Sequence, residues 1–387
     1  MNQPGTSTSM SDRLNQSVPP ADAALMRSAI QRVATGPELS KNLSYDEARA
    51  VMLAILQGTT NPVQAGVFLI GLRMKRETDI ELQGVMDALR QSTSTMTAAI
   101  DDVVVVSDPY NGFNRTVHSS LFALPVLAAC GVSVYSHGVD MVGPKFGVTH
   151  HAILRALGGN PLRTVDDVAS RLADPAIGWG YLDQATFNPQ LHGLNDLRNL
   201  IVKRPVLSTT EVLLDPIRAK QRTHLITGYV HKPYRDTYAM LAKHCKFDSL
   251  LLVRGTEGGV IPSFRADAHV VQYVNSGNEV ELDIALAPLD LAREYRALDI
   301  PDDTKKPPID KQEMGMKWDI DALATLCANE GRKALSGEPG PVYDAAVLGA
   351  ALTLWHIGAE PDMLSATNRA REAISSGAAT KRLDAGL

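Results

Sequence analysis

The sequence predicts an α/β fold, in which a mostly parallel sheet is wrapped by helices, beside a separate all-α module built from N-terminal and other helices. Two observations predict it. Helix-capping signals recur at short intervals within residues 23–98, and from residue 101 onward short apolar runs alternate with helical patterns. We therefore expect a flexible tail over residues 1–22, a helical module over 23–98, and an α/β domain over 99–387 that ends in helices.

Composition and charge limit the classes of protein to which the chain can belong. The chain has 387 residues, of which 44% are hydrophobic and 21% charged, as in ordinary globular proteins. The net charge of −5 excludes a uniformly basic nucleic-acid binder, and three cysteines without a CxxC spacing exclude a disulfide scaffold. The longest near-apolar run, residues 121–132, is too short to cross a bilayer, and no secretory signal is visible. We expect a cytoplasmic protein with no membrane partner.

The N-terminal part reads as a tail followed by helices. Residues 1–22 are rich in Ser, Thr, Asn, Gln and Pro, so they offer little to bury. Two capping boxes follow, in which a hydroxyl accepts from the third backbone N–H and a glutamate reaches back, and a third helix has a cap residue before proline. These three helix starts are Ser44 with Glu47, Thr78 with Glu81, and Asn61 before Pro62.

The sequence pattern changes after residue 101, where short apolar runs begin. A run of four valines over residues 103–106 is typical of a strand covered on both faces. Further strands are expected at residues 132–135, 177–182, 224–230, 250–253 and 269–274. Helical patterns are expected at residues 119–130, 150–157, 161–172, 233–243, 319–334, 342–356 and 362–376. Strands that alternate with helices predict a parallel sheet covered by helices.

Ligands of a parallel sheet bind beyond the carboxyl ends of its strands, and a loop follows the valine strand there. Residues 107–112 lead into Asn114, Thr116, Ser119 and Ser120, whose N–H groups and hydroxyls are suited to hold a phosphate. A plain Asx/Pro turn with a capped helix explains the same residues, and both interpretations stay open.

Two more loops follow predicted strands. The first, residues 137–147, contains His137, which is suited to bond a substrate oxygen, and Lys145, which is suited to neutralise a phosphate, although single residues of this kind are often only solvated. The second, residues 254–259, offers one carboxylate, Glu257, and a magnesium ion usually needs one or two carboxylates with phosphate oxygens. We therefore expect Glu257 as a candidate Mg2+ ligand, with no second carboxylate beside it.

Two histidines stand together at the next helix start. Adjacent side chains on a helix do not face one way, so His150 and His151 are not expected to bind one metal ion together.

Basic residues are concentrated in one segment. Residues 198–246 hold ten Lys and Arg against three acidic residues, a net charge of +7 that leaves −12 for the rest of the chain. Such segregation suits a polyanion, either a phosphorylated sugar or a DNA or RNA backbone, whereas a solvated face with salt bridges is the alternative. The candidate nucleic-acid contacts are Lys203, Arg204, Arg218, Lys220, Arg222, Lys232 and Arg235.

Several motifs together match a known family. They are Asn61-Pro62 through residues 71–75, Ala128-Ala129-Cys130-Gly131 followed by His137-Gly138, Lys145 with Gly147, Arg198 with Arg204, Asp215-Pro216, and residues 337–341 with 370–374. Over residues 30–385 the chain resembles the anthranilate phosphoribosyltransferase family, the glycosyltransferase family 3 fold. It looks most like the diverged second branch of that family, some members of which bind DNA.

The resemblance implies a transferase site and a homodimer formed through the N-terminal helices. It implies that Lys145, Thr116 or Ser120 and Glu257 hold a phosphoribosyl donor with Mg2+, and that His137, Arg198 and Arg204 orient an acceptor. No residue is assigned a catalytic role. The full set of expected substrate-binding residues is Asn114, Thr116, Ser119, Ser120, His137, Gly138, Lys145, Gly147, Arg198 and Arg204.

Four motifs depart from the family pattern. In the acceptor loop, the Phe-Asn and Gly-Pro of the family become Leu207-Ser208 and Glu211-Val212. The glycine-rich diphosphate loop is here Ser107-Asp108-Pro109-Tyr110-Asn111-Gly112, where Pro109 lacks an N–H donor and Asp108 adds repulsion. The Asn-Arg after His-Gly is Val139-Asp140, and the metal-binding Asp-Glu pair becomes roughly Gly258-Gly259. These departures argue against authentic anthranilate activity.

Three hypotheses remain, and the third is a diverged transferase that acts on a different phosphorylated sugar or nucleobase. In the first, the chain is a phosphoribosyltransferase-like protein that binds a phosphorylated sugar or a diphosphate in a basic cleft, and whether it is an enzyme stays open. In the second, it is a catalytically silent protein that binds nucleic acid without reading sequence. We favour the first because Lys145, Arg198 and Arg204 are all present.

Overall fold

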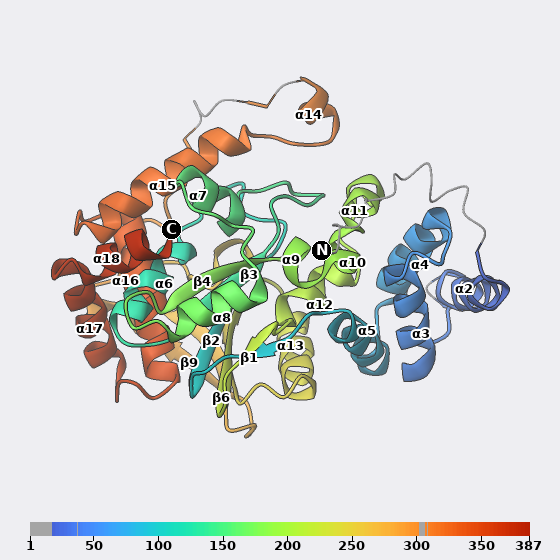
Figure 1. Cartoon of the computed structure of the whole chain (residues 1–387), viewed down its shortest axis with the longest axis horizontal. Coiled ribbons are helices and arrows are strands. Elements are labelled where there is room, and N and C mark those ends of the chain that lie inside the picture. Colours follow the sequence, from blue (N-terminus) through green and yellow to red (C-terminus); the bar gives the residue numbers. More distant parts are fainter. Residues whose placement is uncertain (1–17, 37, 302–305, 308) are drawn as a thin grey trace. The chain divides into compact units, whose positions relative to one another are not determined.

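The computed structural model describes residues 18–36, 38–301, 306–307 and 309–387, which form two compact units (Figure 1). The helical unit takes the chain up to Thr93 together with Val142–Pro144 and Asn188–Leu214. The sheet unit takes Ser94–Met141, Lys145–Phe187 and Asp215–Leu387. Our expected boundary near residue 98 therefore misses a second contribution, residues 188–214, to the helical unit.

The helical unit begins at Pro20, inside the last residues of the range expected to be a tail, while residues 1–17 lie outside the described part. Its elements are α2 (Pro20–Val33), α3 (Tyr45–Leu56), α4 (Pro62–Lys75), α5 (Asp79–Gln91), α10 (Pro189–His192), α11 (Asn195–Ile201), α12 (Leu207–Thr210) and the 3₁₀ turn η2 (Glu211–Leu213). The late helix α11 packs on α4, and α12 packs on α5.

The predicted helix starts of this unit are confirmed. Both capping boxes are present, since the hydroxyls of Ser44 and Thr78 accept from the N–H groups of Glu47 and Glu81, whose carboxylates accept in return. The side chain of Asn61 likewise caps α4. Local sequence therefore fixes where these helices begin.

The sheet unit contains seven strands in the order β4-β3-β2-β6-β7-β8-β9. The parallel strands are β2 (Asp102–Ser107), β3 (Val134–Gly138), β4 (Trp179–Asp183), β6 (Arg222–Gly228) and β7 (Ser249–Val253). The antiparallel strands are β8 (Ala268–Val274) and β9 (Val280–Ile284), and β1 (Met96–Thr97) pairs separately with β5 (Ile217–Arg218). The predicted α/β class with a mostly parallel sheet is confirmed.

The sheet unit also contains helices, most of which pack around the sheet. They are α6 (Ala123–Ala129), α7 (His150–Ala156), α8 (Val165–Ala173), α9 (Gln184–Phe187), α13 (Pro233–His244), α14 (Ile309–Glu313), α15 (Ile320–Leu335), α16 (Pro341–His356), α17 (Met363–Ser375) and α18 (Ala378–Gly386), with 3₁₀ turns η1 (Ser120–Phe122), η3 (Thr256–Gly258) and η4 (Ala287–Leu289). No helix in the described ranges is both long and apolar enough to cross a membrane.

The valine run in the central strand β2 is buried on both faces of the sheet. Val104 and Val106 join the large apolar cluster that contains residues of α6 and α16. Val103 and Val105 point to the opposite face, because side chains alternate along a strand, and they are buried as well. The strand is therefore held rigidly, and the loop that follows it starts from a fixed point.

Candidate functional site

The loops after β2 and β3 lie side by side at the carboxyl edge of the sheet. The N–H of Phe113 donates to the Val148 carbonyl at 2.9 Å, and the N–H of Val148 donates to the Phe113 carbonyl at 2.7 Å. A Cβ on Gly147 would lie 2.4 Å from the Phe113 nitrogen, so only glycine permits this approach. The expected site residue Gly147 therefore acts through the backbone, by joining the two loops.

The loop after β7 joins the same group through Asp108. The N–H of Val260 donates to Asp108 Oδ1 at 3.0 Å. A Cβ on Gly259 would lie 2.6 Å from that oxygen, so the two loops are in close contact. The Asp108 carboxylate is buried and accepts from donors of the protein, whereas we expected it to add repulsion toward a diphosphate.

Four neighbouring residues surround the carboxylate of Glu257 with hydrogen-bond donors. Oε1 accepts from the N–H groups of Arg115 at 2.9 Å and Thr116 at 2.8 Å, and from the Thr116 hydroxyl at 3.0 Å. Oε2 accepts from the Asn114 N–H at 3.3 Å and lies 2.5 Å from Lys145 Nζ. We call these donors, from residues 114–116 and Lys145, the anion cradle.

Burial and charge act in opposite directions on this glutamate. The side chain of Glu257 is 4% exposed and that of Lys145 is 11% exposed. Burial alone would raise the pKa of Glu257, but the charge and hydrogen bond of Lys145, with the N–H groups of Thr116 and Asn114, hold that pKa below its ordinary value. Glu257 is therefore an anion held by an electropositive cradle.

These surroundings do not fit a magnesium ion at Glu257. A divalent cation would have to replace the Lys145 ammonium and the N–H donors that already face both carboxylate oxygens. Asp108 is equally engaged, since Val260, His118 and Ser120 donate to it. Within the residues that the structure describes, we find no carboxylate pair at this edge that fits Mg2+.

A second group of possible metal ligands lies close by. Single ligand atoms of Asp108, His118 and His150 lie within 4.8 Å of one another. The rings of His118 and His150 are stacked, however, with centroids 4.6 Å apart and planes at 25°. Nitrogen lone pairs lie in the ring plane, so those of stacked rings run side by side and do not converge on one ion. Imidazoles are also not the oxygen donors that magnesium prefers.

Hydrogen bonds explain the same cluster without an ion. The Ser120 hydroxyl contacts both Asp108 and His150, whose other ring nitrogen lies 2.9 Å from Ser136 Oγ. Burial lowers the pKa of His150 to about 3. The expected phosphate ligand Ser120 is thus part of a buried network, while Ser119 lines a small neighbouring cavity of ≈ 20 Å³ with Thr116.

His137 is buried at the end of β3, where Gly138 is the last residue. Its Nε2 lies 2.8 Å from Ser107 Oγ, and its Nδ1 contacts the Tyr110 hydroxyl. The side chain is only 3% exposed. In the described conformation His137 therefore ties the first two loops together, whereas we expected it to face a substrate.

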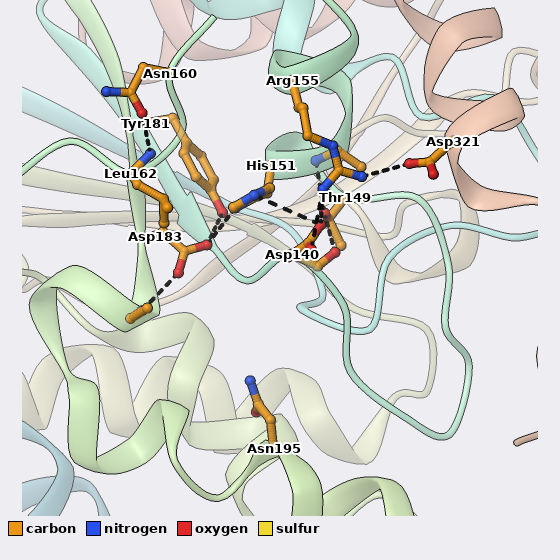
Figure 2. A network of polar contacts seen from close by, with 12 residues as sticks. Asp140, Thr149, His151, Arg155, Asn160, Leu162, Tyr181, Asp183, Asn195 and Asp321 are labelled. Atoms are coloured by element: carbon orange, nitrogen blue, oxygen red, sulfur yellow. Dashed lines mark hydrogen bonds and ion pairs between the residues drawn. The ribbon is translucent and has the colours of Figure 1, made fainter. Parts of the chain in front are cut away.

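Figure 2 shows a further network, centred on His151. Its Nδ1 lies 2.7 Å from Asp183 Oδ2, at the end of β4, and its Nε2 lies 3.8 Å from Asp140 Oδ1. Asp183 is 1% exposed, whereas Asp140 is half exposed and also pairs with Arg155. A buried carboxylate that orients a histidine is an arrangement used for proton transfer.

Sequence reasoning missed the His151–Asp183 pair. The available signals were an aspartate at the end of a buried strand and, elsewhere in the chain, a histidine at the start of a helix. Sequence reasoning did predict that His150 and His151 face different ways, and the two side chains lie in different hydrogen-bond networks.

The two expected acceptor arginines belong to the helical unit. Arg198 is 1% exposed and forms a two-pronged ion pair with Glu211, at 2.7 and 2.6 Å. Arg204 is exposed, as is Lys203. Arg198 is therefore a buried structural residue in this conformation, which corrects the substrate-facing role that we expected for it.

The remaining basic residues of segment 198–246 belong to the sheet unit, and several are paired. Arg218 contacts Asp215, Arg222 lies 2.6 Å from Asp102, and Arg235 lies 2.6 Å from Glu281. Lys220 and Lys232 are exposed. Part of the segment's +7 charge is thus neutralised locally.

A larger cavity of ≈ 560 Å³ lies at the opposite edge of the sheet. Asp102, Arg222 and His224 line it, at the amino ends of β2 and β6. Ligands of parallel sheets bind at the carboxyl ends, so the anion cradle is the better candidate site.

Comparison with known proteins points to one family. Residues 27–93 match the model of the helical bundle domain of the glycosyl transferase family. Anthranilate phosphoribosyltransferases from Rhodopseudomonas palustris strains BisA53 and HaA2 are 28% and 29% identical, over 92% of this chain and 96% of theirs. An uncharacterized protein from Aquifex aeolicus is 29% identical over 57% of this chain and 65% of its own length.

Solved structures match across most of the chain as well. Anthranilate phosphoribosyltransferase from Thermus thermophilus has a TM-score of 0.67 at 20% identity, covering 93% of this chain and 97% of that one. The Saccharomyces cerevisiae enzyme, in complex with PRPP and Mg, has a TM-score of 0.70 at 15% identity, covering 93% and 96%. Sequence relatives and fold therefore agree: the chain is similar to anthranilate phosphoribosyltransferases over most of its length, and residues 27–93 match the helical bundle domain of the glycosyl transferase family.

Proposed function

We propose that this chain binds a phosphorylated sugar or a diphosphate at the anion cradle, as a phosphoribosyltransferase-like protein. One observation carries the proposal: successive N–H groups of residues 114–116, the Thr116 hydroxyl and Lys145 all converge on a single anion. Phosphate oxygens accept from the same kinds of donor. The related yeast enzyme was solved in complex with PRPP and Mg, which supports a ligand of this class.

The cradle suits the leaving group of a ribosyl transfer. In such a reaction the bond between ribose C1 and a diphosphate oxygen breaks, the diphosphate leaves with the electron pair, and a nucleophilic atom of the acceptor bonds to C1. Fixed donors aimed at the diphosphate stabilise the charge that develops on it. His151, held by Asp183, is the candidate group for taking a proton from the acceptor.

Magnesium would have to arrive with the ligand. The described carboxylates at this edge already face donors, so the ion would be held by the phosphates of the ligand and not by Glu257. The departures from the family motifs together argue against authentic anthranilate activity, and we leave the acceptor unnamed.

Titration calorimetry with phosphoribosyl diphosphate, with and without Mg2+, tests the proposal. We expect measurable binding to the wild-type chain and at least about a tenfold weaker affinity in Lys145→Ala, since a charged partner is lost. Lys333→Ala is the control, because Lys333 forms an exposed ion pair with Glu330 at 2.7 Å elsewhere in the sheet unit. Two results would contradict the proposal: no heat from the wild type at millimolar ligand, or equal affinity of Lys145→Ala and Lys333→Ala for the ligand.

Nucleic-acid binding by segment 198–246 stays a prediction, as does membership of the diverged branch. The ion pairs of Arg218, Arg222 and Arg235 reduce the charge that a phosphate backbone would meet. The contacts at the anion cradle favour a small phosphorylated ligand instead.

A further inference from the structure

We propose that Glu257 is a built-in occupant of the phosphate site, a carboxylate that an incoming phosphate group must displace before it can bind. This inference rests on the proposed function and adds to it a competition between the protein and its ligand. It also assigns the class of ligand: a phosphate ester or diphosphate with enough negative charge to replace a carboxylate.

The first argument is occupancy. Both oxygens of Glu257 are saturated by donors: Oε1 accepts from Arg115 and Thr116, and Oε2 contacts Asn114 and Lys145. With its side chain only 4% exposed, the carboxylate fills the cradle. A phosphate group brought to the same donors would meet a like charge in a site of low dielectric, so the two anions exclude each other.

The second argument is that the turn carrying Glu257 is held in an unfavourable conformation. Glu257 has φ +56° and ψ +13°, a left-handed conformation that residues with a Cβ seldom adopt. Its neighbour Thr256 has a buried hydroxyl oxygen that lacks a hydrogen-bond partner among the described residues. The contacts of the carboxylate offset the cost of the left-handed backbone at Glu257, and release of the carboxylate lets this turn relax, which favours displacement by a competing anion.

The third argument concerns selectivity. A singly charged anion offers the cradle no more charge than Glu257 does, and it must bind from solution, whereas the carboxylate is already tethered. A phosphate monoester or a diphosphate carries more charge and more acceptor oxygens. The tether therefore excludes chloride, acetate and similar anions and admits multiply charged phosphates.

The experiment compares diphosphate affinity by titration calorimetry in the wild type, Glu257→Gln, Glu257→Gly and Glu330→Gln. Glutamine keeps the shape of the side chain and removes its charge. Glycine removes the side chain and suits the left-handed backbone at this position, so this variant is expected to fold. Glu330→Gln removes the carboxylate of an exposed pair with Lys333 elsewhere in the sheet unit and serves as the control.

We expect diphosphate to bind both Glu257 variants at least about tenfold more tightly than the wild type, which corresponds to the removal of one competing carboxylate. Glu330→Gln should match the wild type, and adding Lys145→Ala to Glu257→Gln should abolish the gain. Circular dichroism verifies that each variant is folded.

The outcomes separate the two proposals. Equal diphosphate affinity in the wild type and both Glu257 variants overturns the displacement and leaves the proposed function standing. No binding of diphosphate or phosphoribosyl diphosphate by any folded variant overturns the proposed function as well. If neither Glu257 variant folds, amide NMR of the wild type decides: unchanged Arg115 and Thr116 N–H signals at saturating diphosphate overturn the inference.

Discussion

At the scale of single residues, Asp108 links the loops after β2 and β7 through one buried carboxylate. Its oxygens accept from the Val260 N–H and the Ser120 hydroxyl, and one lies 3.2 Å from His118 Nε2. Burial alone would raise the pKa of Asp108, but the hydrogen bond and charge of His118, the charge of His150 and the Ser120 hydroxyl bring it down to about 2. The ionised form is therefore strongly favoured in the folded state.

This depressed pKa predicts acid sensitivity. Because the folded pKa lies below the unfolded value of about 4, the stabilisation is present above about pH 4 and is lost as pH falls toward 2. We expect Asp108→Asn to lower the free energy of unfolding by about 3 kcal/mol at pH 7 and to flatten its decline between pH 4 and pH 2.

Urea unfolding of both proteins across this pH range provides the measurement. Asp299→Asn is the control, since Asp299 is 82% exposed and lies 4.0 Å from Arg296. A variant as stable as the wild type at pH 7, with the same acid decline, would show that Asp108 carries no such linkage.

At the scale of elements, the short ladder between the first two loops positions the anion cradle. The Phe113–Val148 pair precedes residues 114–116 directly, and the Asn114 side chain donates to the Lys145 carbonyl at 3.1 Å. The backbone N–H groups and the Lys145 ammonium are thus held by a contact that itself depends on glycine at position 147.

Gly147→Ala tests this dependence. The new Cβ would clash with the backbone of Phe113 and Gly112, so we expect a loss of about 2–3 kcal/mol in stability and weaker phosphate binding. Gly340→Ala is the control, because nothing lies within 4 Å of a Cβ there. Thermal unfolding and diphosphate calorimetry measure the two effects; unchanged values in Gly147→Ala would contradict the close approach of the loops.

Helix α4 presents an apolar face that bears on the predicted homodimer. Val63, Val67 and Met74 lie on one side of it and are 61%, 45% and 74% exposed. The family resemblance implies a dimer through the N-terminal helices, and we expect Val67→Glu to convert a species of twice the 41.7 kDa chain mass to the monomer. Light scattering measures the mass, and Leu364→Glu, at an exposed residue of α17, is the control. A wild-type monomer at micromolar concentration would refute the dimer.

The elements that sequence predicted best were those with strong local signals. The capped helices α3, α4 and α5 and the buried strand β2 lie where residue patterns placed them. Strand β9 was missed because it is a mostly exposed edge strand, although Val-Glu-Leu-Asp-Ile alternates as a half-buried strand does. The short helices α9 to α12 were missed since helices of four to seven residues contain too few turns to show a period.

At the scale of the whole molecule, sequence singled out the components of the site but not their contacts. Lys145, Thr116 and Glu257 were each expected near a phosphate, yet nothing in the sequence indicates that Glu257 accepts from N–H groups 141 residues earlier in the chain. The same limit applies to Arg198, because its charge is visible in the sequence whereas its buried partner Glu211 is a property of the packed fold. Long-range pairing of charges decides which of them a ligand meets.

The helical unit is built from stretches of chain that lie far apart in the sequence, and this affects how it folds during synthesis. While the ribosome makes the chain, α4 and α5 emerge early, but the segment that packs on them, Asn188–Leu214, follows roughly 10 s later at ordinary elongation rates. During that interval the nascent chain exposes apolar surface of both helices. Chaperone capture of this intermediate, or its aggregation at high expression, is the cost of building one unit from two distant stretches of chain.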